Sequence, residues 1–311
     1  MHASQHTPSA VVHVAGNAAI DVLVQTPEAL PAEGSHTWGA NTVLVSDPIE
    51  MTMGGGGAAP AYVLGKLGQS VSLNSNIGCD RPGGLVRNWL SDAGVDLLAA
   101  ARQPPATAVH VVHLDEEARR RSAYYPGEKV NWLDSLDAPP SPWLLALGYG
   151  RVDADDFSKL EELFATAHGR GTQVVFDPSP WFAGSVPREH MLALWPYLHG
   201  LVATEEELAH WLPDKSGEAL GEAALAAGTD FVVIKRGPHG ALYAAASGES
   251  GTVPAEAAAQ SSSIGAGDAL NGRLLYGLST DEDLPTPVTA AVSLATDVVR
   301  RGRGVLGALE V

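Results

Sequence analysis

A glycine pair directly before an acid, late in the chain, is the pattern best suited to chemistry. Gly265, Ala266, Gly267 and Asp268 stand between a run of serines and an apolar helical pattern. We expect the three small residues to present unpaired amide N–H groups at a helix start, where partial positive charge favours a bound phosphate. Asp268 would then accept a proton from a substrate hydroxyl, as in a kinase. The alternative is a structural glycine turn, with Ser263 near an N-cap and Asp268 in the first helical turn.

The composition indicates a folded protein that repels polyanions. The 311 residues are 45% hydrophobic, and 19 basic against 36 acidic side chains give a net charge of −17. This charge disfavours nucleic acid and anionic membranes as partners, so a phosphate site must supply its own donors. Cys79 is the single cysteine, which excludes an intrachain disulfide and a cysteine-based zinc cluster. The amino terminus lacks a basic signal-peptide region and no apolar run approaches ~18 residues, so we expect a cytoplasmic protein.

The elements that must position this site alternate between strand and helix. The strands expected are Val11–Val14, Val71–Ser75, Trp143–Leu147, Val174–Asp177, Leu201–Ala203, Phe231–Lys235 and Ala241–Ala245. The helices expected are Ala58–Leu67, Pro82–Ala93, Asp153–His168, Thr204–Trp211, Gly267–Tyr276 and Thr286–Arg301. Short apolar strands between helices predict an α/β protein with a mostly parallel central sheet covered on both faces. Ligands bind such sheets at the carboxyl ends of the strands, where Asp177 and Lys235 stand.

A second, smaller sheet is expected from the earlier extended segments. Thr37–Val45 reads as extended, and Val109–Leu114 with Ser122–Tyr125 forms a hairpin around the charged link 115–121. We expect the small sheet to come from about 13–50 and 108–126. Because no clean linker interrupts the chain, residues 1–311 are interpreted as a single domain.

Several glycine-rich or acidic segments follow one another along nearly the whole chain. They are Gly16-Asn17 with Asp21, then Gly54–Ala59, Asn76–Gly83, Gly94–Asp96, Asp177-Pro178, Thr204–Glu207, Lys235–Gly240 and Gly265–Asp268. In this order they resemble the ribokinase-like (PfkB-type) carbohydrate kinases. The resemblance implies a three-layer sandwich with a small β-sheet lid. It also implies ATP-dependent phosphorylation of a hydroxyl on a sugar or sugar derivative.

The resemblance assigns catalytic and nucleotide roles to particular residues. Asp268 would be the base, and Gly265, Ala266 and Gly267 the anion hole around the transferred phosphoryl group. Its place at a helix start would lower the pKa of Asp268. The residues expected at ATP are Thr204, Lys235, Gly237 and Gly240, while Glu207 would act on Mg²⁺ through water. The alternative for Lys235 is a strand-end lysine before a hairpin turn, and for Glu207 a solvated acidic helix start.

The substrate side is expected at the lid. Asp21 would accept sugar hydroxyls, and Gly54, Gly55 and Gly56 would let the backbone approach the ring, unless this run is only a flexible turn. Arg120, in the basic run 119–121, would bind an anionic substituent on the substrate, although a solvated basic turn explains it as well. In the family the lid sometimes pairs between subunits, which makes a homodimer through the lid sheet a candidate assembly. The histidines show no metal signature, because His110 and His113, three apart in a predicted strand, should point to opposite faces.

Three positions depart from the family pattern. Pro60 stands where an asparagine continues the glycine motif, Thr204 replaces an asparagine, and Ser262 replaces an aspartate close to a monovalent-cation site. Potassium dependence and the identity of the sugar therefore stay open. The alternatives are a nucleoside kinase of the same fold and a catalytically silent sugar- or nucleotide-binding relative. A nicotinamide oxidoreductase using the glycine run lacks the acid expected ~20 residues later.

Overall fold

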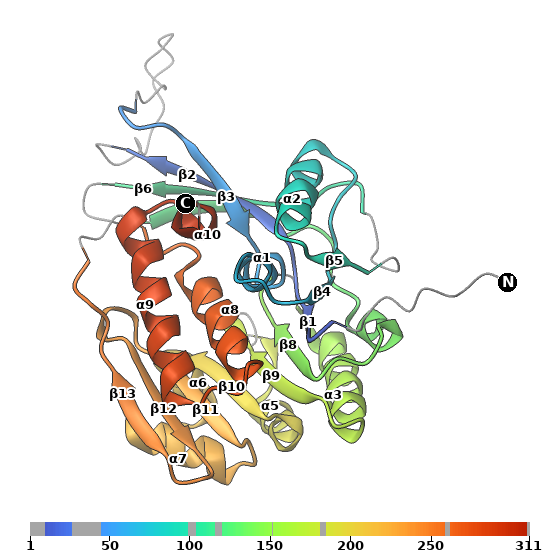
Figure 1. Ribbon diagram of the computed structural model, residues 1–311, viewed down its shortest axis with the longest axis vertical. Coiled ribbons are helices and arrows are strands. Elements are labelled where there is room, and N and C mark those ends of the chain that lie inside the picture. Colours follow the sequence, from blue (N-terminus) through green and yellow to red (C-terminus); the bar gives the residue numbers. More distant parts are fainter. Residues whose placement is uncertain are drawn as a thin grey trace, which may run out of the picture.

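Nine strands form a central sheet with helices on both faces, and four more strands form a separate small sheet (Figure 1). The computed structural model describes residues 10–26, 45–98, 104–115, 120–150, 152–180, 185–258 and 262–309. The central strand order is β13-β12-β11-β10-β9-β8-β1-β4-β5. Pairing is parallel from β11 to β5, and the β11–β12–β13 edge is antiparallel. The predicted mostly parallel α/β fold is confirmed.

The strand and helix bounds follow the expected alternation closely. The central strands are β1 (Val12–Ala15), β4 (Val71–Asn74), β5 (Asp96–Leu97), β8 (Trp143–Leu147), β9 (Gln173–Asp177), β10 (Gly200–Thr204), β11 (Phe231–Lys235), β12 (Ala241–Ala245) and β13 (Ser250–Val253). The helices are α1 (Ala58–Lys66), α2 (Arg81–Asp92), α3 (Ala154–Gly169), α5 (Arg188–Leu194), α6 (Glu205–Trp211), α7 (Glu218–Ala226), α8 (Ala266–Leu278), α9 (Pro285–Arg301) and α10 (Gly304–Leu309). Short 3₁₀ turns lie at Trp132–Asp137, Trp195–Tyr197 and Gly237–His239.

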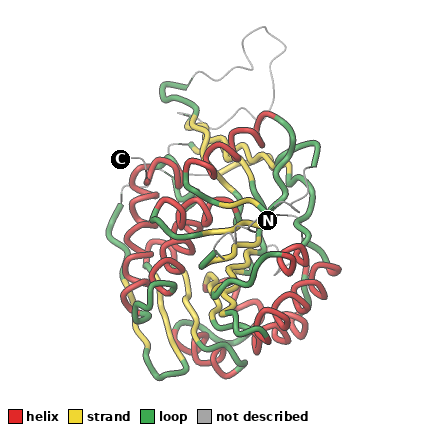
Figure 2. The backbone as a smooth tube through the Cα atoms, turned by 45° about the vertical axis from the view of Figure 1, so that its right-hand side comes forward, coloured by secondary structure: helices red, strands yellow, loops and turns green. Residues whose placement is uncertain are grey.

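Two apolar cores explain why the central strands are continuously hydrophobic. Successive side chains alternate between the faces, so Leu145 packs into one core while Leu144 and Ala146 pack into the other. One core contains buried side chains from α1, α2, α8, α9 and α10, and the other contains those from α3, α5, α6 and α7. Figure 2 shows the helices gathered in two layers around the strands. Within the described ranges, the helices all fall short of the length and apolarity that a membrane span requires.

The lid sheet consists of β2 (Ala19–Gln25), β3 (Glu50–Gly54), β6 (Ala108–Leu114) and β7 (Arg120–Tyr125), in the order β3-β2-β6-β7. Its first strand begins later than the expected boundary near residue 13, because β1 belongs to the central sheet between β4 and β8. All four residues of β1 are buried, as a strand covered on both faces requires. Of the expected segment Thr37–Val45, residues 37–44 lie outside the described residues.

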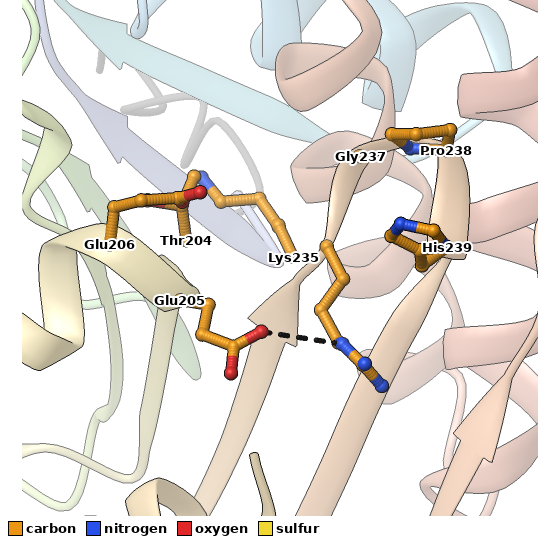
Figure 3. A pocket seen from close by; sticks show the side chains of 8 residues that line it. Thr204, Glu205, Glu206, Lys235, Gly237, Pro238 and His239 are labelled. Atoms are coloured by element: carbon orange, nitrogen blue, oxygen red, sulfur yellow. Dashed lines mark ion pairs between the residues drawn. The ribbon is translucent and has the colours of Figure 1, made fainter. Parts of the chain in front are cut away.

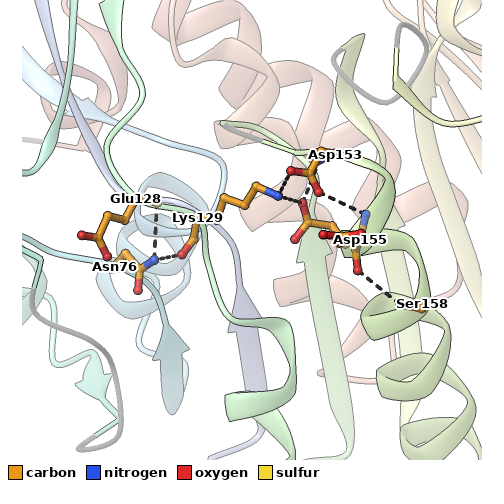
Figure 4. A network of polar contacts seen from close by, with 7 residues as sticks. Asn76, Glu128, Lys129, Asp153, Asp155 and Ser158 are labelled. Atoms are coloured by element: carbon orange, nitrogen blue, oxygen red, sulfur yellow. Dashed lines mark hydrogen bonds and ion pairs between the residues drawn. The ribbon is translucent and has the colours of Figure 1, made fainter.

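A network of polar contacts ties the chain leaving the lid to the large sheet (Figure 4). The Asn76 amide donates to the backbone carbonyl oxygens of Glu128, at 3.4 Å, and Lys129. Lys129 Nζ pairs with Asp153 and, at 3.1 Å, with Asp156. These two acids form the capping box of α3, so one lysine connects the exit of the lid to a helix start.

Candidate active site

The first turn of α8 is open at Gly267 but packed at Gly265, where a Cβ would lie 3.2 Å from Val305. Gly265 is the N-cap, with φ +82°, a conformation that favours glycine, and it offers no side chain for capping. Ser263 does not cap through its side chain; its carbonyl accepts a hydrogen bond from the amide of Ala266. A Cβ at Gly267 would meet no atom of the described residues within 4 Å. The residue directly before Asp268 is therefore open on its Cβ side, at a helix start whose amides favour a bound phosphate.

Asp268 lies in this first turn, but its pKa differs from the sequence-based expectation. Burial first, and then the charges of Asp21 and Asp177, raise the pKa of Asp268 to about 7, while the charge of Lys235 opposes the rise. The expected lowering was wrong because the helix start is a weaker influence than loss of water and two nearby acids. The side chain is half-buried. A carboxyl group with a pKa near neutrality is well suited to act as a general base.

Asp177, Lys235 and Asn271 form a buried network beside this turn. Lys235 Nζ lies 2.6 Å from Asp177 Oδ2, and Asn271 Nδ2 donates to the same oxygen at 2.7 Å. Burial alone would lower the pKa of Lys235, but the Asp177 carboxylate holds it above its usual value. Sequence reasoning missed Asn271; the available signal was its position three residues after Asp268, on the same helix face.

A pocket of about 370 Å³ opens beside Lys235 at the carboxyl ends of β10 and β11 (Figure 3). It is lined by Thr204, Glu205, Glu206, Lys235, Arg236, Gly237, Pro238 and His239. Of the residues expected at the nucleotide, three line this pocket. Gly240 does not; its φ is +82°, and a Cβ there would lie 2.0 Å from the carbonyl oxygen of Val253. The dashed line in Figure 3 marks the Glu205–Arg236 ion pair, with Oε2 and Nε 3.4 Å apart.

Thr204 and Glu207 form the capping box of α6. The Thr204 hydroxyl accepts from the Glu207 amide at 3.2 Å, and Glu207 Oε2 accepts from the Thr204 amide at 2.7 Å. Threonine thus keeps a local hydrogen bond in place of the family's asparagine. Glu207 is buried, and burial raises the pKa of its carboxyl although Lys235 opposes the rise. The solvated acidic helix start considered for Glu207 is therefore wrong.

The glycine run is closely packed rather than a flexible turn. A Cβ at Gly54 would lie 2.4 Å from Asp21 Oδ2, and Gly55 has φ +86°. The amide of Gly56 donates to Asn17 Oδ1 at 2.8 Å, and Asn17 Nδ2 donates to Tyr124 Oη at 3.1 Å. The run therefore fixes the backbone against the side chains that surround Asp21.

On the lid, Asp21 has two polar neighbours that sequence reasoning did not assign to the site. His110 Nδ1 lies 3.2 Å from Asp21 Oδ1, and Tyr124 packs edge-on against the His110 ring. Burial and the Asp21 charge raise the pKa of Tyr124 to about 12, so the phenol remains a hydrogen-bonding group. Arg120 Nη2 lies 3.1 Å from His110 Nε2. Strand register places Asp21, His110 and Tyr124 side by side, and the Arg120 side chain reaches His110 from the position opposite Leu114.

Two of the departures from the family pattern have simple structural accounts. Pro60 is the third residue of α1, in the first helical turn, where proline is tolerated. The Ser262 hydroxyl is buried and accepts from the amide of Ile264 at 3.3 Å. Serine here supports the loop that leads into Gly265.

Fold and site together define a ribokinase-like protein, and comparison with known proteins gives the family. Residues 15–307 match the pfkB family of carbohydrate kinases, and the chain belongs to that family. Ribokinase from Thermotoga maritima is 21% identical, with a TM-score of 0.72 over 96% of this chain and 95% of its own. Ribokinase from Arabidopsis thaliana, solved with ribose and ATP, is 18% identical, with a TM-score of 0.72 over 96% and 95%. An E. coli protein provisionally named ribokinase II, solved with ATP and Mg²⁺, is 18% identical, with a TM-score of 0.76 over 97% and 96%.

Proposed function

We propose that this protein transfers the γ-phosphate of ATP to a hydroxyl group of a sugar or sugar derivative. The observation that carries the proposal is the position of Asp268: a carboxyl group with a pKa raised to about 7, in the first turn of a helix whose glycine faces open space. Family membership makes the sugar the expected acceptor. The neighbours solved with ribose, ATP and Mg²⁺ support the same pairing of substrates.

The chemistry needs little covalent help from the protein. The substrate oxygen attacks the γ-phosphorus, the bond to the β–γ bridging oxygen breaks, ADP leaves, and the hydroxyl proton passes to Asp268. The amides of Gly265, Ala266 and Gly267 would stabilise charge on the transferred group. Asp21, with Gly54, Gly55 and Gly56, would hold the sugar so that its hydroxyl lies beside Asp268.

The pocket beside β10 and β11 would hold the nucleotide. Thr204, Lys235 and Gly237 contribute to it, with Gly240 supporting the turn behind it. Lys235 lines the pocket and its charge also acts on Asp268, so we assign it to the γ-phosphate end of the nucleotide. Arg236 is the more exposed cation at the same strand end.

The residues present fit a magnesium ion held mainly by the nucleotide. Within the described ranges, no three His, Cys, Asp or Glu side chains are arranged as a metal cage. Mg²⁺ commonly keeps several waters and binds substrate phosphates with only one or two carboxylates. Glu207 uses Oε2 in the capping box, which leaves Oε1 to hold a metal-bound water. When bound, the ion would neutralise charge on the transferring phosphates.

The test is turnover across a panel of sugars, sugar acids, sugar phosphates and nucleosides, with Asp268→Asn as the matched variant. We expect kcat on the preferred sugar to fall by ~10²–10⁴ in Asp268→Asn while ATP binding, measured by calorimetry, stays unchanged. Wild-type turnover no faster than the variant on every compound would reject catalysis and favour a silent binder. Preference for a nucleoside would instead select the nucleoside kinase alternative.

The outer face of the lid sheet supports a homodimer. Met51 and Tyr125, on the two edge strands, are 55% and 52% exposed, and Ile49 beside β3 is 54% exposed. Exposed apolar side chains on unpaired sheet edges favour association with another sheet. Light scattering should give twice the monomer mass, and Met51→Glu should reduce it. A monomer at micromolar concentration would refute this assembly.

A further inference from the structure

A guanidinium group shares the inner face of the lid sheet with Asp21. Register places Asp21 opposite His110, and His110 opposite Tyr124, in one row across three strands. Alternate residues of a strand point to the same face, so Arg120 lies on the Tyr124 face of β7. Arg121 lies on the opposite face, paired with His113.

This face is directed towards the catalytic loop. Leu23, Val112 and Leu114 belong to it by the same alternation, and they form a small apolar cluster that packs against Ile264. Ile264 immediately precedes Gly265, the N-cap of α8. Leu114 is also the register partner of Arg120. The lid arginine is therefore on the side of the sheet that faces the loop before Asp268.

Arg120, His110 and Asp21 form a chain with a defined direction. A guanidinium only donates hydrogen bonds, so His110 Nε2 must accept from Arg120 at 3.1 Å. The ring proton then lies on Nδ1, which donates to Asp21 Oδ1 at 3.2 Å. This arrangement orients the Asp21 carboxylate. The contact with His110 uses one donor of the exposed Arg120 guanidinium. Within the described part of the chain, Arg120 forms no ion pair with a carboxylate.

We propose that the acceptor substrate carries an anionic substituent, a carboxylate or a phosphate ester, which binds Arg120. The proposal rests on the proposed function, because it specifies the sugar bound at Asp21. Arginine presents several donors in a planar fork that matches the oxygens of either anion. Asp21 would bind the hydroxyl groups of the same molecule, while His110 orients the Asp21 carboxylate. A net charge of −17 makes such a positive site necessary for an anionic substrate to bind.

The experiment compares matched substrates in matched variants. Each five- or six-carbon neutral sugar or polyol is assayed beside its carboxylate and phosphate-ester counterparts, for example glucitol with gluconate and fructose with fructose 6-phosphate. For wild type we expect higher kcat/KM on one anionic series. In Arg120→Ala, the ratio of kcat/KM on the anionic compound to that on its neutral counterpart should fall ~10- to 100-fold. Arg120→Lys should recover part of the loss, and Arg121→Ala should leave the ratio within about threefold.

Each outcome either supports or overturns the proposed binding of an anion by Arg120. In Arg120→Ala, a fall in the anionic-to-neutral ratio of kcat/KM for the carboxylates alone, or for the phosphate esters alone, supports the proposal and identifies the anion. A wild type that prefers neutral sugars, or an equal loss in Arg120→Ala and Arg121→Ala, overturns it while leaving the kinase assignment intact. Absence of turnover on every compound, with ATP bound, would overturn the proposed function as well.

Discussion

Lys235 Nζ lies 2.6 Å from Asp177 Oδ2, and this contact joins the ends of two strands that are separated by β10. Both side chains are largely removed from water, with 9% and 0% of their surfaces exposed. Asn271 adds a second contact, from α8, to the same carboxylate oxygen. The network therefore connects the sheet to the helix that carries Asp268.

Removing one partner should leave a buried charge unpaired. We expect Asp177→Asn or Lys235→Met to lower the free energy of unfolding by ~3–5 kcal/mol, measured in urea. The double variant should lose less unfolding free energy than the two single variants lose together. Arg300→Ala, which breaks the exposed pair with Asp297, is the control and should cost ~1 kcal/mol or less. Equal, small losses in all variants would contradict a strong buried pair.

Asp268 should give the enzyme an acidic limb in its pH profile. The carboxyl group must be ionised to take a proton, and its pKa is raised to about 7, so kcat/KM should decline as the pH falls below about 7. A profile flat down to pH 5 would argue against Asp268 as the base.

The same raised pKa predicts an effect on stability. The folded protein holds this proton more tightly than the unfolded chain does, so the stability contribution is present below about pH 4 and is lost as pH rises through about 7. Asp268→Asn cannot ionise, and it should therefore melt above wild type at pH 8. The difference should shrink towards pH 5, and a constant difference at all pH values would indicate another cause.

Gly267→Ala separates folding from catalysis. The added methyl group meets no described atom within 4 Å, and alanine favours helix over glycine by ~0.5–1 kcal/mol. We expect an unfolding free energy equal to or above that of wild type, together with a drop of at least tenfold in kcat/KM because the methyl group occupies the phosphoryl space. Full activity in a stable variant would show that nothing binds there.

Lys129 should be important for stability although it lies away from the site. Lys129→Met leaves the Asp156 carboxylate, 1% exposed, without its cation, and we expect a loss of ~1–3 kcal/mol in urea unfolding. Lys215→Met, at an exposed lysine, is the matched control and should stay within ~0.5 kcal/mol of wild type. A similar loss in both variants would mean that total charge, not this contact, is responsible.

The central fold was accessible from sequence because its signals are local. Apolar strands such as Trp143–Leu147 and Phe231–Lys235 match the structure residue for residue, since both faces of the sheet are buried. The boundary of the lid was less accurate. The strand near residue 12 is short and apolar, and only its pairing with β4 and β8 assigns it to the large sheet.

The candidate site was predictable where one motif contains the chemistry and unpredictable where tertiary contacts create it. Asp268 and the glycines before it stand together in the sequence. His110, Tyr124 and Asn271 reach their neighbours only through strand register and helix packing. The expected lowering of the Asp268 pKa was wrong for the same reason, because the burial of its side chain and the approach of Asp21 and Asp177 arise only in the folded chain.

Asp21 on the lid sheet and Asp268 at the start of α8 carry like charges, and the charge of Asp21 is one cause of the raised pKa of Asp268. In the empty site this repulsion favours a protonated Asp268, which cannot take a proton from water. A substrate lying between the two carboxylates relieves this repulsion by donating its hydroxyl hydrogens. Hydrolysis of the nucleotide by water is thereby disfavoured until an acceptor substrate binds.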